Sequence, residues 1–396
     1  MRIKKLYIIY CLALTISVNH LNVYGQNQES NLHYQMGMKE FYNFNYAEAI
    51  QHLELSAASP ISNPASSYYY IGMAHYHMGH MDEAEDFLIR AIENEENTSY
   101  SMSLAQVYIF NKEYDRALSI LQPLTMRDST NSYFHKVIGK VYMANQDFIS
   151  AIDAFGKANR CDSNDIETIQ LLAQSHFSLK EYFVGLEIIK KAVVLIPNSK
   201  KLLSIQLFAE VKTTEYGQAL QTADRLIALG DSSHINQKLY GIALYKTEQI
   251  ESSVKIFEKL IRAGRGDEGI HYYLSEGYRK LGRIDDQLLH LDTAIYTYGI
   301  GPMVDQYYQL LGDAHEAKGK IKLALDDYKR AYHLKADYLY IYQIARLSDL
   351  YYRDKRIAFD HYQRYLATGD STAKLMAEER IQYLKEIIHQ QKTDKK

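Results

Sequence analysis

Small and bulky apolar residues recur along this chain in a frame of about 34 residues. Within each frame a small residue is followed twelve positions later by Ala, and a bulky apolar residue follows four positions after that. The clearest examples are Gly72–Ala84–Leu88, Gly139–Ala151–Phe155 and Gly312–Ala324–Tyr328. Apolar residues at three- and four-residue spacing are typical of amphipathic helices. We therefore expect each frame to form two antiparallel helices, with the small residues placed where the two axes cross closely.

The frame can be followed ten times along the chain. Its first small position falls at Gly37, Gly72, Ala105, Gly139, Ala173, Leu207, Gly241, Ser275, Gly312 and Arg346. The position twelve later is Ala in seven of the ten frames, although the frames at Leu207 and Arg346 depart from the pattern. Repetition at one period over most of a chain indicates a stack of equivalent units. The sequence thus predicts an all-α fold, an α-solenoid of about ten antiparallel helix pairs.

Two of the frames carry a recognisable consensus. Residues 274–295 are similar to the pattern Leu-small-x-x-Tyr-x-x-x-Gly-x-x-x-x-Ala, with Gln287 in place of the Ala. Residues 103–121 match it with Tyr108 and Ala117 in place. On these residues the chain resembles the tetratricopeptide repeat (TPR) family. The resemblance implies that the α-solenoid is a right-handed superhelix.

The repeat array is expected to occupy residues 26–371, and residues 372–396 are expected to form a capping helix and a polar tail. A terminal repeat needs such a cap, with one apolar side against the array and a polar outer side. The apolar residues expected to face the array are Leu375, Ile381, Leu384 and Ile388. The longest step between frames, from Ser275 to Gly312, predicts a bend or flexible joint.

The first 25 residues differ from the rest of the chain. Three basic residues precede an apolar run over residues 6–18, and the small residues Val23 and Gly25 lie around a plausible cleavage point. This is the pattern of a secretory signal peptide cleaved near Gly25, since the run is too short to span a bilayer comfortably. An uncleaved N-terminal anchor is the alternative. With residues 1–25 removed, we expect no stable membrane insertion and a location in the periplasm or outside a bacterial cell.

The composition is that of a soluble chain with an excess of tyrosine. The formal net charge is −3 and becomes −6 without the three basic residues of segment 1–25, and such mild acidity argues against nucleic-acid binding. There are 36 Tyr but no Trp, which suits surfaces that are half buried or that grip ligands. Cys161 alone remains after cleavage, so no disulfide framework is expected.

Short motifs that resemble chemical sites fit the repeat better. A Gly-x-Gly-x-x-Gly match over residues 264–269 joins two predicted helices, whereas a dinucleotide site needs a preceding strand. The Arg-Gly-Asp tripeptide inside it is interpreted as part of a loop. His75 and His77 lie two residues apart on a helix, about 200° around it, so they cannot share a metal ion. We expect no enzyme activity, no metal site and no cofactor.

In the TPR family the first helix of each pair lines a concave groove, and its second, fifth, ninth, twelfth and thirteenth positions bind peptides. Carried over to this sequence, these positions include Tyr34, Met38, Tyr69, Met73, Tyr76, His77, Met102, Phe110, Tyr133, Lys136, Lys140, Lys238, Tyr245, Lys246, Tyr272 and Lys280. The first third of the expected groove is thus rich in aromatic residues and Met, and its middle part is basic. The alternative is that several of these Tyr and Met side chains pack between adjacent repeats. A carboxylate clamp of Lys and Asn found in some members is not carried over, because Tyr34 and Met38 occupy its places in the first repeat.

These features favour an exported, non-enzymatic protein-interaction scaffold that binds a partner polypeptide in the concave groove. The partner would be a protein or peptide with apolar anchors and acidic residues. Aromatic and Met side chains supply adaptable contact area, and Lys supplies attraction and orientation. The alternative is an accessory or sensor subunit that binds a glycan or another small ligand on its Tyr-rich concave surface.

Overall fold

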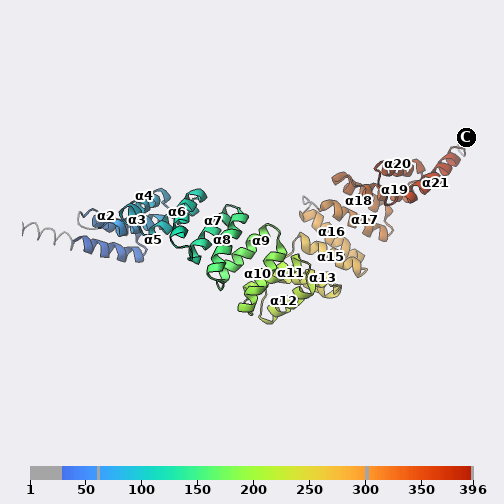
Figure 1. Ribbon diagram of the computed structural model, residues 1–396. Helices are drawn as coiled ribbons and strands as arrows, with labels where there is room; N and C mark the ends of the chain where they lie inside the picture. Colours follow the sequence, from blue (N-terminus) through green and yellow to red (C-terminus); the bar gives the residue numbers. More distant parts are fainter. Residues whose placement is uncertain (1–28, 60–62, 299–302, 394–396) are drawn as a thin grey trace, which may run out of the picture. The chain divides into compact units, whose positions relative to one another are not determined.

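The structure is a computed structural model that describes residues 29–59, 63–298 and 303–393. These residues form α-helices joined by short turns, and no strand occurs among them. The chain divides after Ile196 into two compact units, unit 1 and unit 2. Within each unit, consecutive helices pack as antiparallel pairs that stack in chain order (Figure 1). The expected all-α solenoid is therefore confirmed.

The ten frames of the sequence correspond to ten helix pairs among the described residues, five in each unit. Unit 1 contains a first helix over residues 29–42, α2 (Tyr46–Ala57), α3 (Ala65–Met78), α4 (Met81–Asn94), α5 (Thr98–Phe110), α6 (Tyr114–Arg127), α7 (Ser132–Ala144), α8 (Phe148–Cys161), α9 (Ile166–Ser178) and α10 (Tyr182–Leu195). Unit 2 contains α11 (Lys200–Lys212), α12 (Tyr216–Ala228), α13 (His234–Lys246), α14 (Ile250–Arg262), α15 (Glu268–Lys280), α16 (Ile284–Tyr298), α17 (Val304–Ala317), α18 (Ile321–Leu334), α19 (Tyr338–Tyr351), α20 (Lys355–Ala367) and α21 (Lys374–Thr393).

The small position of the frame lies where the two helices of a pair touch. On α7, a Cβ atom built on Gly139 would lie 2.6 Å from the ring of Phe155 on α8. On α17, a Cβ atom on Gly312 would lie 2.7 Å from the ring of Tyr328 on α18. The Ala found twelve positions later is fully buried in every frame that has one. Close approach of the two backbones therefore excludes larger side chains at Gly139 and Gly312.

The turn inside nine of the ten pairs contains one residue with positive φ. At Gly79 φ is 82°, which glycine adopts without steric cost. At Lys112 φ is 62°, in a region that a residue with a Cβ atom rarely adopts. The same turn forms with either residue, so its geometry is imposed by the packing of the helix pair.

The last helix, α21, covers the end of the array. It packs on α20 and buries Ala377, Ile381 and Leu384, while Ile388 is half-buried. Leu375 is instead 68% exposed, so the expectation that it faces the array is wrong. Leu375 lies two residues before Ala377, about 200° around the helix, and its side chain therefore leaves from the opposite side.

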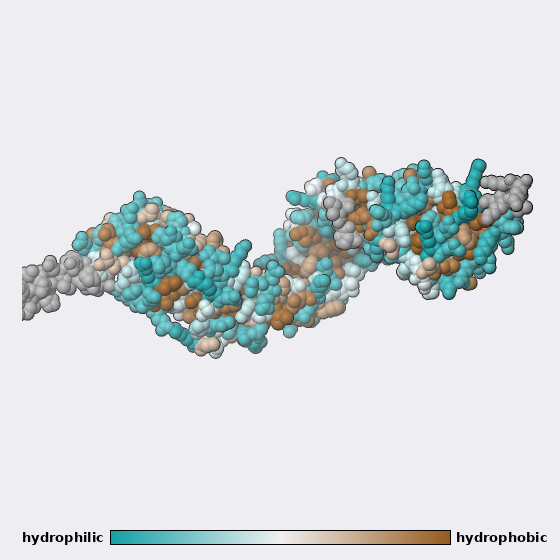
Figure 2. Space-filling model, turned by 90° about the horizontal axis from the view of Figure 1, so that it is seen from above, coloured by the Kyte–Doolittle hydropathy of each residue, from teal (hydrophilic) through white to brown (hydrophobic). Residues whose placement is uncertain are grey.

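The predicted signal peptide over residues 1–25 lies outside the described residues, and so do residues 299–302 in the longest step between frames. Within the described part of the chain, no helix is both long and apolar enough to cross a bilayer. The face of each unit seen in Figure 2 is mostly hydrophilic, with apolar side chains gathered in separate patches.

Candidate functional site

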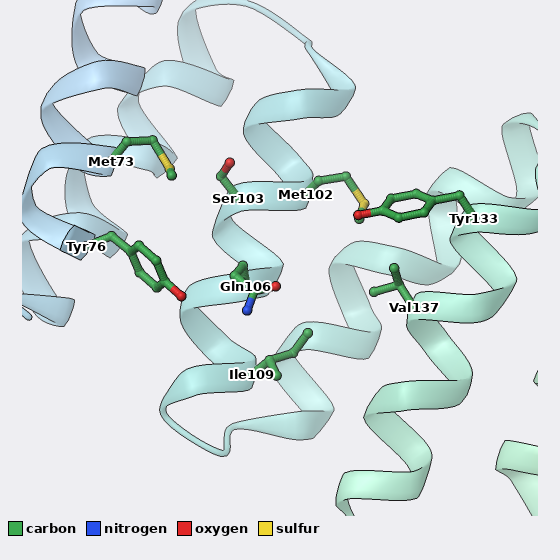
Figure 3. A pocket seen from close by; sticks show the side chains of 8 residues that line it. All are labelled: Met73, Tyr76, Met102, Ser103, Gln106, Ile109, Tyr133 and Val137. Atoms are coloured by element: carbon green, nitrogen blue, oxygen red, sulfur yellow. The ribbon is translucent and has the colours of Figure 1, made fainter. Parts of the chain in front are cut away.

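A cavity of about 200 Å³ opens between three successive first helices of unit 1, namely α3, α5 and α7 (Figure 3). It is lined by Met73, Tyr76, Met102, Ser103, Gln106, Ile109, Tyr133 and Val137. The thioether of Met102 points toward Tyr133, and the hydroxyl end of Tyr76 points toward Gln106 (Figure 3). Thioethers and phenol rings form an adaptable, largely apolar wall, and the amide of Gln106 adds hydrogen-bonding capacity.

The cavity follows from helical periodicity. Met102, Gln106 and Ile109 stand at i, i+4 and i+7 on α5, so they share one face of that helix. Met73 and Tyr76 stand at i and i+3 on α3 and share its face in the same way. Counted from the start of each first helix, the lining residues occupy the second, fifth, sixth, ninth and twelfth positions. Equivalent faces of neighbouring repeats thus line one surface.

Four of the predicted groove residues meet in this cavity. They are Met73, Tyr76, Met102 and Tyr133. The other lining residues were missed, although Gln106 and Ile109 occupy the ninth and twelfth positions that the family pattern marks. Ser103 and Val137 occupy the sixth position, which that pattern leaves out. Residues at the sixth position lie one turn before the ninth, so helical geometry alone would have found them.

Several predicted aromatic residues of the first repeats pack against other rings. The Tyr69 ring stacks on Tyr100 with ring centroids 4.7 Å apart. His77 stacks on Tyr46 at 5.3 Å, and Tyr34 meets a ring of the next repeat edge-on at 6.5 Å. Such pairs add stabilisation beyond the burial of apolar area. Packing between helices therefore accounts for the contacts of these three residues.

Two further predicted residues lie outside the cavity lining. Met38 is half-buried on the first helix of unit 1. Phe110 ends α5 and is 60% exposed, with its ring centroid 6.1 Å from that of Tyr76. Phe110 therefore extends the apolar surface beyond the ring of Tyr76.

Four of the five predicted lysines are ion-paired with a carboxylate of the neighbouring repeat. The pairs are Lys136 with Asp165 (2.9 Å), Lys140 with Glu167 (2.7 Å), Lys238 with Asp267 (2.7 Å) and Lys280 with Glu248 (2.7 Å). The hydrogen bond to Asp165 raises the pKa of Lys136, whose side chain is only 15% exposed. Lys246 is exposed and has no carboxylate partner among the described residues. Because four of the five charges are balanced within the chain, this surface attracts an acidic partner less than its lysine content indicates.

The two predicted tyrosines of unit 2 differ in exposure. Tyr245 is 8% exposed, and its hydroxyl donates a hydrogen bond to Glu276 Oε2 at 3.3 Å. Burial, together with the neighbouring carboxylate, raises the pKa of Tyr245. Tyr272 is half-buried and lines a second hollow, between α15 and α17. Of the two, only Tyr272 contributes its side chain to an open surface.

The short motifs have structural roles. His75 stacks on Phe87 with ring centroids 5.6 Å apart, whereas His77 contacts different rings. Asp267 of the Arg-Gly-Asp tripeptide caps α15 by accepting a hydrogen bond from the backbone N of Ile270 at 2.9 Å. Over residues 29–59, 63–298 and 303–393, no group of three or more His, Cys, Asp or Glu side chains is placed to hold a metal ion.

Two family models match parts of the chain, one in each unit. A model described as anaphase-promoting complex, cyclosome, subunit 3 matches residues 42–124. A model described as tetratricopeptide repeat matches residues 305–338, which is one repeat length. No curated protein matches the chain.

Solved structures with similarity to the chain have low sequence identity. MamA from residue 41 to its end, from Desulfovibrio magneticus RS-1, is 19% identical over 43% of this chain and 97% of that one, with a TM-score of 0.39. A tetratricopeptide repeat protein from Parabacteroides merdae ATCC 43184 is 14% identical over 72% of this chain and 98% of that one, with a TM-score of 0.41. The C-terminal part of a TPR repeat-containing protein from Cytophaga hutchinsonii is 17% identical over 69% and 98% of the two chains, with a TM-score of 0.47.

The matched segments, the ten helix pairs and the small residues at their crossings define a class of protein, the α-solenoids built from repeated helix pairs. The chain is a tetratricopeptide repeat protein. Folds of this family are protein-interaction modules and are typically non-catalytic.

Proposed function

We propose that this chain is a non-enzymatic scaffold that binds a segment of a partner polypeptide across α3, α5 and α7, with an apolar side chain of the partner in the cavity. The cavity itself carries the proposal, because three successive first helices contribute Met73, Met102 and Tyr133 to one wall. Clefts with an apolar lining and a few placed polar groups are the usual form of binding sites. The partner is a polypeptide because repeated first helices present an elongated surface on which a chain can lie.

The chemistry of the lining favours an apolar anchor over an acidic one. The thioethers of Met73 and Met102 adapt to side chains of different shape, and the Tyr133 ring supplies a rigid contact. Gln106 can hydrogen-bond the partner's main chain beside the anchor. The nearest predicted lysines, Lys136 and Lys140, form ion pairs with carboxylates of the next repeat. Acidic residues of the partner would therefore contribute less than its apolar anchor.

The proposal includes export of the chain. Its support is the basic start, the apolar run over residues 6–18 and the small residues Val23 and Gly25 around the expected cleavage point. Expression of the full chain in a bacterium, followed by cell fractionation and N-terminal sequencing, tests this part. We expect a mature protein that begins near Gln26 in the periplasmic or medium fraction. An uncut chain in the cytoplasmic fraction would show that export is wrong.

Peptide-library selection against the purified chain, followed by titration of the selected peptides, tests the binding site. The variant Met102→Lys places a charge in the cavity and is expected to weaken binding by tenfold or more, since the ammonium group must be desolvated or must expel the anchor. The matched control is Met126→Lys on α6, because Met126 is 84% exposed and lies on a second helix. Equal affinities of the two variants for the selected peptides would reject the cavity as the site.

A further inference from the structure

A second hollow, of about 410 Å³, lies between the first helices α15 and α17 of unit 2. It is lined by Tyr272, Glu276, Arg279, Gln306, Gln309, Leu310 and Asp313. Counted in the repeat frame, in which Ser275 and Gly312 both hold the eighth position, these residues occupy the second, fifth, sixth, ninth and twelfth positions, as do those of the cavity in unit 1. The two sites are therefore equivalent places in the repeat with different side chains.

Polar side chains with planar ends form both walls of this hollow. On α15, Tyr272, Glu276 and Arg279 stand at i, i+4 and i+7 and share one face. The facing wall on α17 is built in the same way. Its residues are Gln306, Gln309, Leu310 and Asp313, at i, i+3, i+4 and i+7. No Met lines the hollow, and Leu310 is its aliphatic residue, so it offers little to an apolar anchor of the kind that suits the cavity in unit 1.

The charges of the hollow are largely compensated inside the protein. Arg279 donates two hydrogen bonds to Glu276, from Nε to Oε1 at 2.9 Å and from Nη2 to Oε2 at 2.8 Å. Glu276 also accepts a hydrogen bond from the hydroxyl of Tyr245. Asp313 accepts a hydrogen bond from Tyr328 through Oδ1. An anionic ligand would therefore have to displace Glu276 from Arg279 and would also meet the carboxylate of Asp313, which disfavours it.

Several polar groups of the hollow have no hydrogen-bond partner within the described part of the chain. They are the Tyr272 hydroxyl, the amides of Gln306 and Gln309, and Oδ2 of Asp313. Together they present both donors and acceptors to the same space. The ring of Tyr272, which lies half-buried beside Leu310, adds an apolar surface between them.

From this juxtaposition we propose that the hollow between α15 and α17 is a carbohydrate-binding site for an uncharged oligosaccharide. A sugar hydroxyl both donates and accepts, so adjacent hydroxyls match the planar amides of Gln306 and Gln309. The C–H face of a sugar ring packs on the ring of Tyr272. A volume of about 410 Å³ is in the range of small-ligand sites. This site does not depend on the peptide cavity of unit 1.

Isothermal titration of the purified full chain tests the proposal, with cellohexaose, xylohexaose, mannohexaose and chitohexaose as probes. We expect at least one of them to saturate a single site. The variants Gln306→Ala and Gln309→Ala should each weaken that binding by about tenfold, the loss expected from removing one or two hydrogen bonds. Gln218→Ala on α12 is the matched control, because Gln218 is exposed on a second helix of the same unit.

Three outcomes would overturn the proposal. The first is that none of the four oligosaccharides binds. The second is that Gln306→Ala and Gln309→Ala bind the sugar as tightly as Gln218→Ala does. The third is that the uncharged peptide Gly-Ser-Gly-Ser-Gly binds in place of the sugars and loses affinity in the same two variants, which would assign the hollow to peptide main chains. Peptide binding by the cavity in unit 1 is measured separately through Met102→Lys, so the two proposals succeed or fail independently.

Discussion

Tyr340 on α19 donates a hydrogen bond to Asp305 on α17, with Tyr340 Oη and Asp305 Oδ2 2.8 Å apart, and both residues are buried. One repeat earlier, Tyr307 donates to Glu268 on α15 at the same distance. A tyrosine in these places buries a ring and also satisfies a carboxylate of the neighbouring repeat, which phenylalanine could not do. Hydrogen bonds between repeats thus account for part of the excess of Tyr over Phe, 36 against 12.

Removal of the hydroxyl in Tyr340→Phe is expected to lower the free energy of unfolding by about 1–3 kcal/mol, because the buried carboxylate of Asp305 loses its donor. Urea denaturation followed by circular dichroism measures the change. Tyr338→Phe is the control, since Tyr338 lies on the same helix but is 45% exposed. If both variants unfold at the same urea concentration, the hydrogen bond does not stabilise the array.

A methyl group at the helix crossing is expected to destabilise unit 1. In Gly139→Ala the new Cβ atom would lie 2.6 Å from the ring of Phe155, so α7 and α8 must separate or the ring must move. Such overpacking costs about 1–3 kcal/mol. Gly156→Ala on α8 is the matched control, because its Cβ would meet only Arg160 Nη1 at 3.6 Å. The control should be neutral or stabilising by about 0.5–1 kcal/mol, since Ala is the better helix former. Thermal unfolding of the two variants gives the comparison, and a Gly139→Ala protein as stable as Gly156→Ala would contradict close packing at the crossing.

Glycine at the left-handed turn position of the third repeat should raise the free energy of unfolding. Lys112 has a φ of 62° and is exposed, so Lys112→Gly removes the steric conflict of its Cβ atom without loss of a buried contact. We expect a gain in unfolding free energy of about 1 kcal/mol. Lys112→Ala keeps the Cβ atom and should show no such gain. A glycine variant that is no more stable than the alanine variant in urea would show that the turn is unstrained.

Acid should weaken unit 2 through a pair of histidines. Nδ1 of His271 on α15 and Nδ1 of His290 on α16 lie 3.0 Å apart. Burial, reinforced by His271, lowers the pKa of His290 from its ordinary value of 6.5 to about 4, and burial also lowers the pKa of His271. Both histidines are thus neutral in the folded chain at pH values where they are protonated in the unfolded chain. The groups facing the pair include Asp286 and Glu258, which favour protonation but less strongly than burial opposes it.

The pKa of His290 is lower in the folded chain than in the unfolded chain. The contribution of neutral His290 to the free energy of unfolding is therefore fully present above pH 6.5 and is lost as the pH falls from 6.5 toward 4. We expect a loss of about 2 kcal/mol for His290 over this window, allowing for its partial exposure. His290→Gln should flatten that part of the pH profile of urea unfolding, whereas His234→Gln, at an exposed position, should leave it unchanged. An unaltered profile for His290→Gln would exclude the pair as the source of acid sensitivity.

Much of the repeat architecture was predictable, and the candidate sites were predictable in part. The frame led to Met73, Tyr76, Met102 and Tyr133, because side-chain direction on a helix follows from position alone. It also marked Lys136 and Tyr245. Lys136 forms an ion pair with a carboxylate of the next repeat, and Tyr245 donates a hydrogen bond to one. The predicted groove residues include Tyr272 of the polar hollow in unit 2. Gln306, Gln309 and Asp313 hold the second, fifth and ninth positions of the ninth repeat, which the family pattern also marks, so position alone could have found them.

The sequence by itself determined the number of helix pairs, their approximate limits and the small residues at their crossings. A period of about 34 residues and the residue size tolerated at a crossing are local properties, so they can be read one frame at a time. Only the tertiary structure decided which groove positions stay open and which are occupied. Lys136 meets Asp165 across 29 residues of chain, and such a contact depends on how one repeat is turned against the next. The same rotation brings Tyr133 beside Met102 in unit 1 and sets Gln306 and Gln309 opposite Tyr272 in unit 2.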